Sequence, residues 1–256
     1  MTYAIYPSLK DRVVLITGGA GGIGAEHVMQ FAAQGARVGF IDYNPEAAAA
    51  VVDKVRAAGH AAPDFLQVDL RDIDALEGAI AGFIAKAGPV TVLVNNAAHD
   101  ERHTLMEVTS DYFDERIAFN LKHMLFCAKA VAPGMKAAGG GSIVNFGSFS
   151  WRVGLEGMPV YVTAKAGIEG LTKGLARELG GDAIRVNCVI PGWIMTERQL
   201  ELWVTEETKD RIRANQCLKD LVMPADVSRM ALWLAADDSR MCSSQFFTVD
   251  GGWSGR

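Results

Sequence analysis

Cysteine and long apolar runs are scarce in this chain of 256 residues. The four cysteines are scattered and lack the spacing of a metal site, so we expect small apolar side chains in a reducing compartment. No apolar run approaches the roughly 18 residues that cross a bilayer, so we expect no membrane span. The first residues lack a basic stretch followed by an apolar core, which predicts a cytoplasmic protein without a signal peptide.

An excess of positive charge is also missing. The chain has 25 lysines and arginines against 30 aspartates and glutamates, which gives a net charge of −5. This balance predicts neither nucleic acid nor an anionic membrane as a partner. Half of the residues are hydrophobic, enough to bury one large core. Because linkers and repeats are absent, we expect one domain over residues 1–256, with a substrate-side insertion near residues 193–222.

The chain does have a regular alternation of β-rich apolar runs and alanine-rich helical stretches. Such alternation predicts an α/β fold, in which helices cover both faces of a parallel sheet. The apolar runs are continuous, as expected for strands buried on both sides. We therefore predict a Rossmann-type, doubly wound sheet of about seven strands. The strands are expected at residues 12–17, 37–42, 65–69, 91–95, 142–146, 184–190 and 245–249, and the main helices at 22–34, 46–58, 73–87, 111–137, 161–179 and 225–235.

A glycine-rich turn joins the first expected strand to the first expected helix. It fits two patterns: Gly19, Gly21 and Gly24 match the general dinucleotide fingerprint, and Gly18, Gly22 and Gly24 match a different spacing. Glycines let the backbone approach a pyrophosphate, and the helix N-terminus supplies amides and a partial positive charge. The turn therefore predicts a nucleotide-binding site.

Asp42 ends the second expected strand, where a carboxylate accepts hydrogen bonds from an adenosine ribose. It also disfavours a 2′-phosphate, because two like charges about 4 Å apart repel by roughly 4 kcal/mol at an effective dielectric of 20. No lysine or arginine in the glycine turn offsets this charge, so we predict NAD rather than NADP; the alternative for Asp42 is a turn or cap residue. Asp69, at the end of the third strand, is expected at the adenine edge.

Tyr161 and Lys165 lie four residues apart at the start of a helical stretch, so their side chains point the same way. A free tyrosine has a pKa near ~10 and is a poor base. An ammonium about 4 Å away favours the phenolate by roughly 4 kcal/mol, up to about 3 pKa units before desolvation is subtracted. The pair is therefore predicted to act as an acid/base near neutral pH, with a solvated surface pair as the alternative.

Polar residues also follow other expected strands. Asn95 and Asn96 are expected to tie strand ends together and line the cofactor site, and Ser148 closes the fifth strand. Asn120, in the middle of a helix, predicts a buried polar role. His99 and His103 are four apart, but the residue after His99 is not glutamate and no third ligand is obvious. We therefore predict no metal and expect this loop to face a substrate.

Taken in order, these features resemble the short-chain dehydrogenase/reductase family, in its NAD-dependent classical branch. The resemblance runs from Leu9 to Trp253, and it departs from the family pattern at Ala98 and Ser244, where glycine is common. Neither departure removes a catalytic group. The motifs that carry the resemblance are Thr17-Gly18-(x)3-Gly22-x-Gly24, Asp69, Asn95-Asn96-Ala97, Asn120, Ser148, Tyr161-x-x-x-Lys165, Pro191-Gly192 and Asp250-Gly251-Gly252.

The resemblance implies a role for each catalytic residue. Tyr161 is the general acid/base, and Lys165 lowers its pKa and holds the nicotinamide ribose. Ser148 binds the reacting oxygen, and Asn120 supports a water-linked proton relay. A homotetramer built on the helices at 111–137 and 161–179 is also implied. The implied cofactor contacts are Gly18, Gly22, Ile23, Gly24, Asp42, Asp69, Leu70, Asn96, Tyr161, Lys165, Pro191, Gly192, Ile194 and Thr196.

A closer resemblance is to one branch of this family, the bacterial aldose 1-dehydrogenases of the D-xylose type. Residues 4–10, 114–117, 123–127, 130–136, 145–148 and 154–156 carry it. It implies that an aldose is oxidised at the anomeric carbon to a lactone, with hydride transfer to NAD+. D-xylose, L-arabinose, D-galactose and L-fucose stay open as substrates. The side chains expected to contact the sugar are Asn145, Ser148, Trp151, Glu156, Tyr161, Arg198 and Gln199.

Other functions remain possible on the same fold. One is oxidation of a hydroxysteroid or cyclic alcohol, although the polar segment at 193–214 favours a polyol. An acyl-chain ketoreductase usually takes NADP, which Asp42 opposes. A non-catalytic NAD(H)-binding module predicts the loss of a catalytic group, yet Ser148, Tyr161 and Lys165 are all present.

Overall fold

The computed structural model describes residues 3–255, in which seven strands form one parallel sheet. The expected domain of residues 1–256 also includes Met1, Thr2 and Arg256, which lie outside the described residues. The strand order is β3-β2-β1-β4-β5-β6-β7, as predicted for a doubly wound sheet. The strands are β1 (Val13–Thr17), β2 (Arg37–Asp42), β3 (Asp64–Gln67), β4 (Val92–Asn95), β5 (Gly141–Phe146), β6 (Ile184–Pro191) and β7 (Phe246–Val249).

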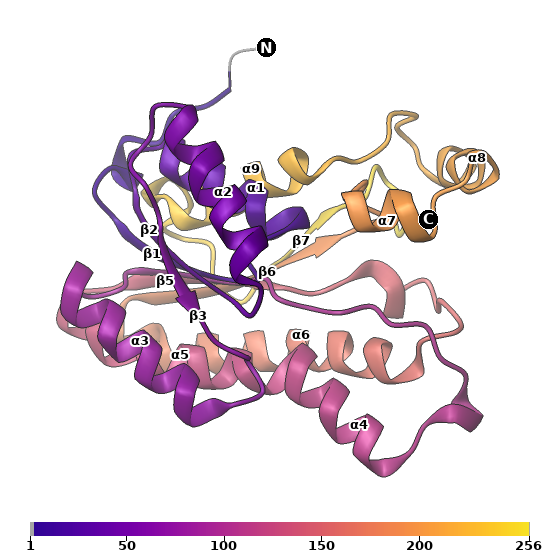
Figure 1. The fold of residues 1–256 in the computed structure, drawn as a ribbon, viewed down its shortest axis with the longest axis horizontal. Helices are drawn as coiled ribbons and strands as arrows, with labels where there is room; N and C mark the ends of the chain where they lie inside the picture. The colour runs from indigo at the N-terminus through magenta and orange to yellow at the C-terminus, as the bar shows by residue number, and fades with distance from the viewer. Residues whose placement is uncertain (1–2, 256) are drawn as a thin grey trace.

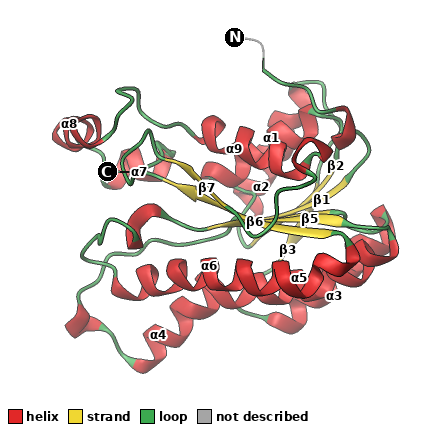
Figure 2. Ribbon diagram, turned by 180° about the vertical axis from the view of Figure 1, so that it is seen from behind, coloured by secondary structure: helices red, strands yellow, loops and turns green. Residues whose placement is uncertain are grey.

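Helices cover both faces of the sheet. Figure 1 shows α1, α2 and α9 on one face and α3, α5 and α6 on the other, and Figure 2 shows the same layers from behind. The segment expected as an insertion contains two helices, α7 and α8, which lie beyond the ends of β6 and β7 (Figure 1). The helices are α1 (Gly22–Ala33), α2 (Pro45–Ala57), α3 (Ile73–Ala87), α4 (Ser110–Ile117), α5 (His123–Ala137), α6 (Pro159–Leu179), α7 (Glu197–Leu202), α8 (Glu206–Asn215) and α9 (Pro224–Ala235).

One helix prediction was wrong. The single helix expected at 111–137 is divided into α4 and α5 by a π-helical turn, Ala118–Lys122. Asn120 lies in this turn and is fully buried. Its amide nitrogen donates to the carbonyl oxygen of Arg116 at 3.0 Å, and its amide oxygen accepts from the backbone amide of His99 at 2.8 Å. Such side-chain bonds compete with the regular helix ladder, and π turns are frequent at functional sites.

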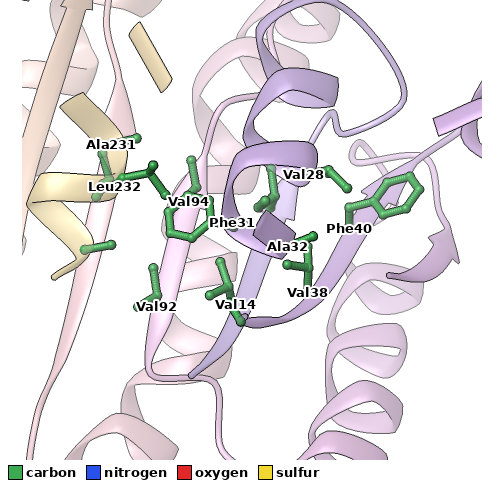
Figure 3. Packing of buried hydrophobic residues seen from close by; sticks show 14 of the residues in the cluster. Val14, Val28, Phe31, Ala32, Val38, Phe40, Val92, Val94, Ala231 and Leu232 are labelled. Carbon is green, nitrogen blue, oxygen red and sulfur yellow. The ribbon is translucent and has the colours of Figure 1, made fainter. Parts of the chain in front are cut away.

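The larger of the cores lies between the sheet and the face formed by α1 and α9. Val28 and Phe31 on α1 are fully buried, and their spacing places both on the side of the helix that faces the sheet. They pack over Val14 of β1 and Val94 of β4, while Leu232 of α9 closes the layer (Figure 3). This packing holds α1, and so the glycine turn before it, against the carboxyl end of β1.

A change in direction of the strand order occurs between β1 and β4. From β1 the chain adds β2 and β3 on one side of the sheet. From β4 it adds β5, β6 and β7 on the other side. The loops after β1 and β4 therefore diverge and leave a crevice at their carboxyl ends, the usual ligand site of such sheets. Of the helices within residues 3–255, none combines the length and the apolar character needed to cross a bilayer.

Candidate functional site

A cavity of about 440 Å³ lies at the carboxyl ends of the central strands. The glycine turn borders one end of it, and α7 and the loop after β4 border the other. The lining residues come from every region that the sequence marked for the cofactor. The expected cofactor residues in the cavity wall are Gly18, Gly22, Ile23, Gly24, Asp42, Leu70, Asn96, Tyr161, Lys165, Pro191, Gly192, Ile194 and Thr196.

The turn requires glycine at four positions, one of which is Gly19, where a Cβ would lie 2.6 Å from the Cβ of Phe40. Gly18 and Gly22 have φ angles of +68° and +54°, in the left-handed region that favours glycine. A Cβ on Gly18 would lie 2.8 Å from the Cα of Ala97, and a Cβ on Gly24 would lie 1.8 Å from the carbonyl oxygen of Gly18. Gly18, Gly22 and Gly24 are the positions of the second expected spacing. The turn and the first amides of α1 thus leave open backbone for a pyrophosphate, so the residues fit a dinucleotide.

Asp42 lies directly against this turn. Its carboxylate accepts hydrogen bonds from the backbone amides of Ala20 at 3.0 Å and Asn44 at 3.1 Å. Within residues 3–255, no lysine, arginine or histidine forms an ion pair with it. A negative charge therefore stands at the nucleotide end of the cavity without a neutralising partner.

Asp69 is held by a neighbouring cation. Its side chain is paired with Arg71, whose guanidinium approaches to 2.6 Å, and this contact holds the pKa of the Asp69 carboxyl below its usual range. The neighbouring residues Val68 and Leu70 line the cavity and form an apolar wall, but Asp69 does not line it. The adenine contact expected of the Asp69 side chain stays a prediction.

Tyr161, Lys165 and Ser148 meet at the middle of the cavity. Tyr161 and Lys165 project from the first turns of α6, and the Lys165 Nζ lies 5.6 Å from the centre of the Tyr161 ring. The Lys165 ammonium donates to the carbonyl oxygen of Phe146 at 2.8 Å. Ser148 follows β5 and lines the cavity beside Tyr161, where its hydroxyl acts to lower the pKa of the phenol. The predicted geometry of a shared helix face is thus present.

The pKa of Tyr161 in the protein alone is raised, whereas the sequence predicted that it is lowered. Burial raises it above its ordinary value and Asp100 adds to this, while Ser148 and Arg102 act in the opposite direction. Lys165 points its nitrogen at a backbone carbonyl, and burial lowers its own pKa to about 8. Desolvation of the phenolate is therefore the largest effect, and Lys165 is not among the groups that shift the Tyr161 pKa.

Asn120 lies behind the cavity rather than in its wall, where Phe119 stands instead. Through its bond to the amide of His99 it connects the π-helical turn with the loop after β4. At the strand ends, the side chain of Asn96 donates to the carbonyl oxygens of Thr17 at 3.1 Å and Gly18 at 3.3 Å. The Asn96 side chain thus joins the ends of β1 and β4, as we expected of the asparagines at this strand end.

Three of the expected sugar contacts do not line the cavity. Asn145 is fully buried within the sheet layer, because the strand register places it opposite Asn95 of β4. The Trp151 indole donates to Glu169 at 2.9 Å instead of facing a substrate. Glu156 is exposed outside the cavity. The expected contacts that do line it are Ser148, Tyr161, Arg198 and Gln199.

The loop after β4 contributes residues to which the sequence assigned no role. Asp100 and Arg102 line the cavity next to the Tyr161 end, and His103 is buried beneath them. The only sequence signal was the position of this loop after a strand. Across the described part of the chain, histidine, cysteine, aspartate and glutamate side chains form no group of three or more that could hold a metal ion.

Comparison with known proteins gives matches along nearly the whole chain. A family model described as enoyl-(acyl carrier protein) reductase matches residues 18–254. The D-xylose 1-dehydrogenase of Caulobacter vibrioides is 50% identical over 253 residues, which cover 99% of this chain and 100% of that protein. The probable galactose dehydrogenase GalD of Rhizobium meliloti is 49% identical over 247 residues, which cover 96% of each chain.

Solved structures share the same fold. A putative gluconate dehydrogenase from Agrobacterium tumefaciens matches with a TM-score of 0.93 at 27% identity, and the match covers 99% of this chain and 100% of that one. A short-chain type dehydrogenase/reductase from Mycobacterium ulcerans matches with a TM-score of 0.92 at 27% identity, over 97% and 92% of the two chains. The α/β fold predicted from the sequence is confirmed.

Proposed function

The chain belongs to the short-chain dehydrogenase/reductase family of oxidoreductases, which use a nicotinamide cofactor, and we propose that it oxidises the anomeric hydroxyl of an aldose to the aldonolactone with NAD. The observation that carries the proposal is the full-length, 50% identity with a D-xylose 1-dehydrogenase, combined with a cavity that holds Ser148, Tyr161 and Lys165 together. A second sugar dehydrogenase at 49% identity supports the substrate class.

Tyr161 takes the proton of the anomeric hydroxyl at its phenolic oxygen. Ser148, beside Tyr161 in the cavity wall, favours the phenolate and binds the same reacting oxygen. Burial lowers the pKa of Lys165 to about 8, and the Phe146 carbonyl fixes its nitrogen on the Tyr161 side of the cavity. NAD+, which the glycine turn and Asp42 would hold, would accept the hydride that leaves the anomeric carbon, and the carbon–oxygen single bond would become the lactone carbonyl.

The choice of NAD over NADP is supported by Asp42. A 2′-phosphate on the adenosine ribose would approach a carboxylate whose two oxygens already accept the amides of Ala20 and Asn44. Repulsion between like charges about 4 Å apart amounts to roughly 4 kcal/mol at an effective dielectric of 20, an upper bound for exposed groups. The ribose hydroxyls of NAD meet no such penalty.

The experiment that tests the function follows the absorbance of the reduced cofactor during turnover with the wild-type protein. D-xylose, L-arabinose, D-galactose and L-fucose are compared, each with NAD+ and with NADP+. We expect the rate to be highest with one aldose and NAD+, and the product to be its lactone. Turnover of cyclic alcohols or steroids without turnover of any aldose would refute the sugar assignment and keep the Tyr161 chemistry.

A second candidate function has one observation in its favour. Phe149, Leu155 and Met158 form an apolar part of the cavity wall on the substrate side of Tyr161. Such a wall also suits the ring of a cyclic alcohol or hydroxysteroid. Opposite it stand Asp100, Arg198 and Gln199, whose polar groups a steroid ring leaves without partners, so the sugar remains the better fit.

We also propose that the protein works as a cytoplasmic homotetramer assembled through α4, α5 and α6. Phe113 on α4 and Leu125 on α5 support this, because both are large apolar side chains that are at least 40% exposed in the single chain. The absence of disulfides among the four cysteines fits a reducing compartment. The molar mass by light scattering after gel filtration tests the assembly, and a monomer at micromolar concentration would contradict it.

A further inference from the structure

Asp100 stands at the substrate end of the cavity. It belongs to the loop after β4 and lines the cavity together with Ser148 and Tyr161. Its side chain is only 20% exposed. A carboxylate so far withdrawn from water needs partners to offset its desolvation.

The partners of Asp100 come from the far side of the cavity. Gln199, on α7, donates its Nε2 to one carboxylate oxygen at 2.7 Å, and the Nε of Arg198 lies 3.5 Å from the other. The Oε1 of Gln199 accepts in turn from the Trp193 indole at 3.0 Å. These contacts fix the carboxylate against α7 and orient it across the substrate end of the cavity.

The carboxylate keeps acceptor capacity after these contacts. An ionised carboxylate has about four lone-pair sites; the Gln199 hydrogen bond occupies one of them, and Arg198 adds an ion pair at 3.5 Å. Its charge also reaches the catalytic pair, because Asp100 raises the pKa of both Tyr161 and Lys165. A charge that acts on both groups lies close to the reacting atoms and is weakly screened by water.

Building on the proposed function, we infer that Asp100 determines specificity. It accepts a hydrogen bond from a sugar hydroxyl other than the one that Tyr161 deprotonates. The substrates are thereby narrowed to aldoses with a hydroxyl in reach of Asp100.

The inference rests on the cost of an unpaired buried acceptor. A site built to bind a substrate hydroxyl rejects an analogue that lacks it, because its own buried group is left without a partner. Neutralising Asp100 weakens this acceptor, and lengthening its side chain displaces it, so both changes should alter the discrimination between such sugars.

The experiment compares kcat/KM for two kinds of substrate: the best aldose and its single-deoxy analogues. Asp100→Asn keeps the shape and removes the charge, and Asp100→Glu keeps the charge and moves it by one methylene. Glu201→Gln is the matched control, because Glu201 lies on α7, is exposed and does not line the cavity. Cofactor affinity is measured for every variant by fluorescence titration with NADH.

We expect Asp100→Asn to lower kcat/KM for the parent sugar at least tenfold and to bring it close to the value for one deoxy analogue. Asp100→Glu should also lose the discrimination against the deoxy analogue, because its carboxylate is displaced by one methylene. Glu201→Gln should behave as the wild type, and the affinity for NADH should stay unchanged in all variants.

Two results would overturn the inference, and they differ from each other. If the wild type oxidises aldoses but the ratio of kcat/KM between the parent sugar and each deoxy analogue is unchanged in Asp100→Asn and Asp100→Glu, Asp100 only anchors Gln199, although the proposed function stands. An equal fall for all substrates would have the same meaning. If the wild type oxidises no aldose but turns over another alcohol, the proposed function fails and the inference fails with it.

Discussion

The backbone amide of Val160 donates a hydrogen bond to the Nε2 of His103 at 3.2 Å. Val160 lies in the first turn of α6, whose N-cap residue Met158 offers no side-chain cap. His103, a buried histidine from the loop after β4, therefore caps α6 at Val160, the residue directly before Tyr161. The catalytic tyrosine and the substrate loop are thus connected through one imidazole.

The partners of the other ring nitrogen define the tautomer. The Nδ1 of His103 lies 2.9 Å from the Tyr112 hydroxyl and 3.0 Å from the carbonyl oxygen of Glu101. Because a carbonyl oxygen only accepts, Nδ1 carries the proton and Nε2 is free to accept from Val160. A glutamine in place of His103 reaches a similar position with an oxygen that accepts from the Val160 amide, whereas an alanine there offers no acceptor.

The first prediction follows from this cap. His103→Ala should lower kcat several-fold and reduce the free energy of unfolding by about 1 kcal/mol, the usual effect of losing a helix cap. His103→Gln should recover most of both, because it restores an acceptor for Val160. Steady-state kinetics and urea unfolding measure the two effects. His60→Ala, in a loop far from the cavity, is the control, and a loss as large in His103→Gln as in His103→Ala would argue against the cap.

Removal of one hydroxyl tests the acid/base. Tyr161→Phe should abolish turnover, because it removes the phenolic oxygen that takes the proton beside Ser148. The affinity for NADH should change by less than about twofold, since the ring and its packing remain. Tyr3→Phe removes a hydroxyl at an exposed position and should have no effect. Activity within tenfold of the wild type would exclude Tyr161 as the acid/base.

Cofactor preference tests Asp42. Asp42→Ala should raise the affinity for NADP relative to NAD by up to about a thousandfold, the ratio that roughly 4 kcal/mol represents. The same variant leaves the amides of Ala20 and Asn44 without their acceptor, so affinity for NAD should also fall. Asp42→Asn keeps an acceptor oxygen and removes the charge, which separates the two effects. Dissociation constants from fluorescence titration give the ratio, and an unchanged ratio in both variants would contradict the role of Asp42.

Much of the fold could be predicted because its signals are local. Central strands such as β1 and β4 are apolar runs, and the buried spacing of Val28 and Phe31 already places α1 on the sheet. The break between α4 and α5 could not be predicted from neighbouring residues. It depends on Asn120 binding the amide of His99, a contact between positions 21 residues apart, which no period or propensity contains.

The residues of the candidate site also differ in how well the sequence alone could place them. Tyr161, Lys165 and Asp42 line the cavity, and the sequence could point to them because each belongs to a motif encoded within a few residues. Asn145 was misplaced because its position depends on the register between β4 and β5. Asp100 was missed because its partner Gln199 is 99 residues away, so only the folded chain brings the two together.

Burial of Lys165 makes stability depend on pH. Its pKa is about 8 in the folded protein and 10.5 ordinarily, so between these values the unfolded chain binds more protons and stability rises with pH. From pH 8 to 10 this group should add about 2 kcal/mol to the free energy of unfolding. Lys165→Met should lack this increment. Urea unfolding of both proteins at the two pH values measures the difference, and parallel pH dependence would show that Lys165 is not desolvated.

Asn145 tests whether a polar residue at a strand end serves the substrate or the sheet. Its side chain accepts from Asn95 at 2.9 Å and donates to Thr172 at 3.0 Å, and all three are fully buried. Asn145→Ala removes one hydrogen bond from each of these buried partners, which should reduce the free energy of unfolding by roughly 2 kcal/mol. KM for the sugar should stay within twofold, because Asn145 does not line the cavity. Asn215→Ala on α8, at a partly buried position outside the cavity, is the control, and a raised KM without loss of stability would restore the substrate contact that the sequence suggested.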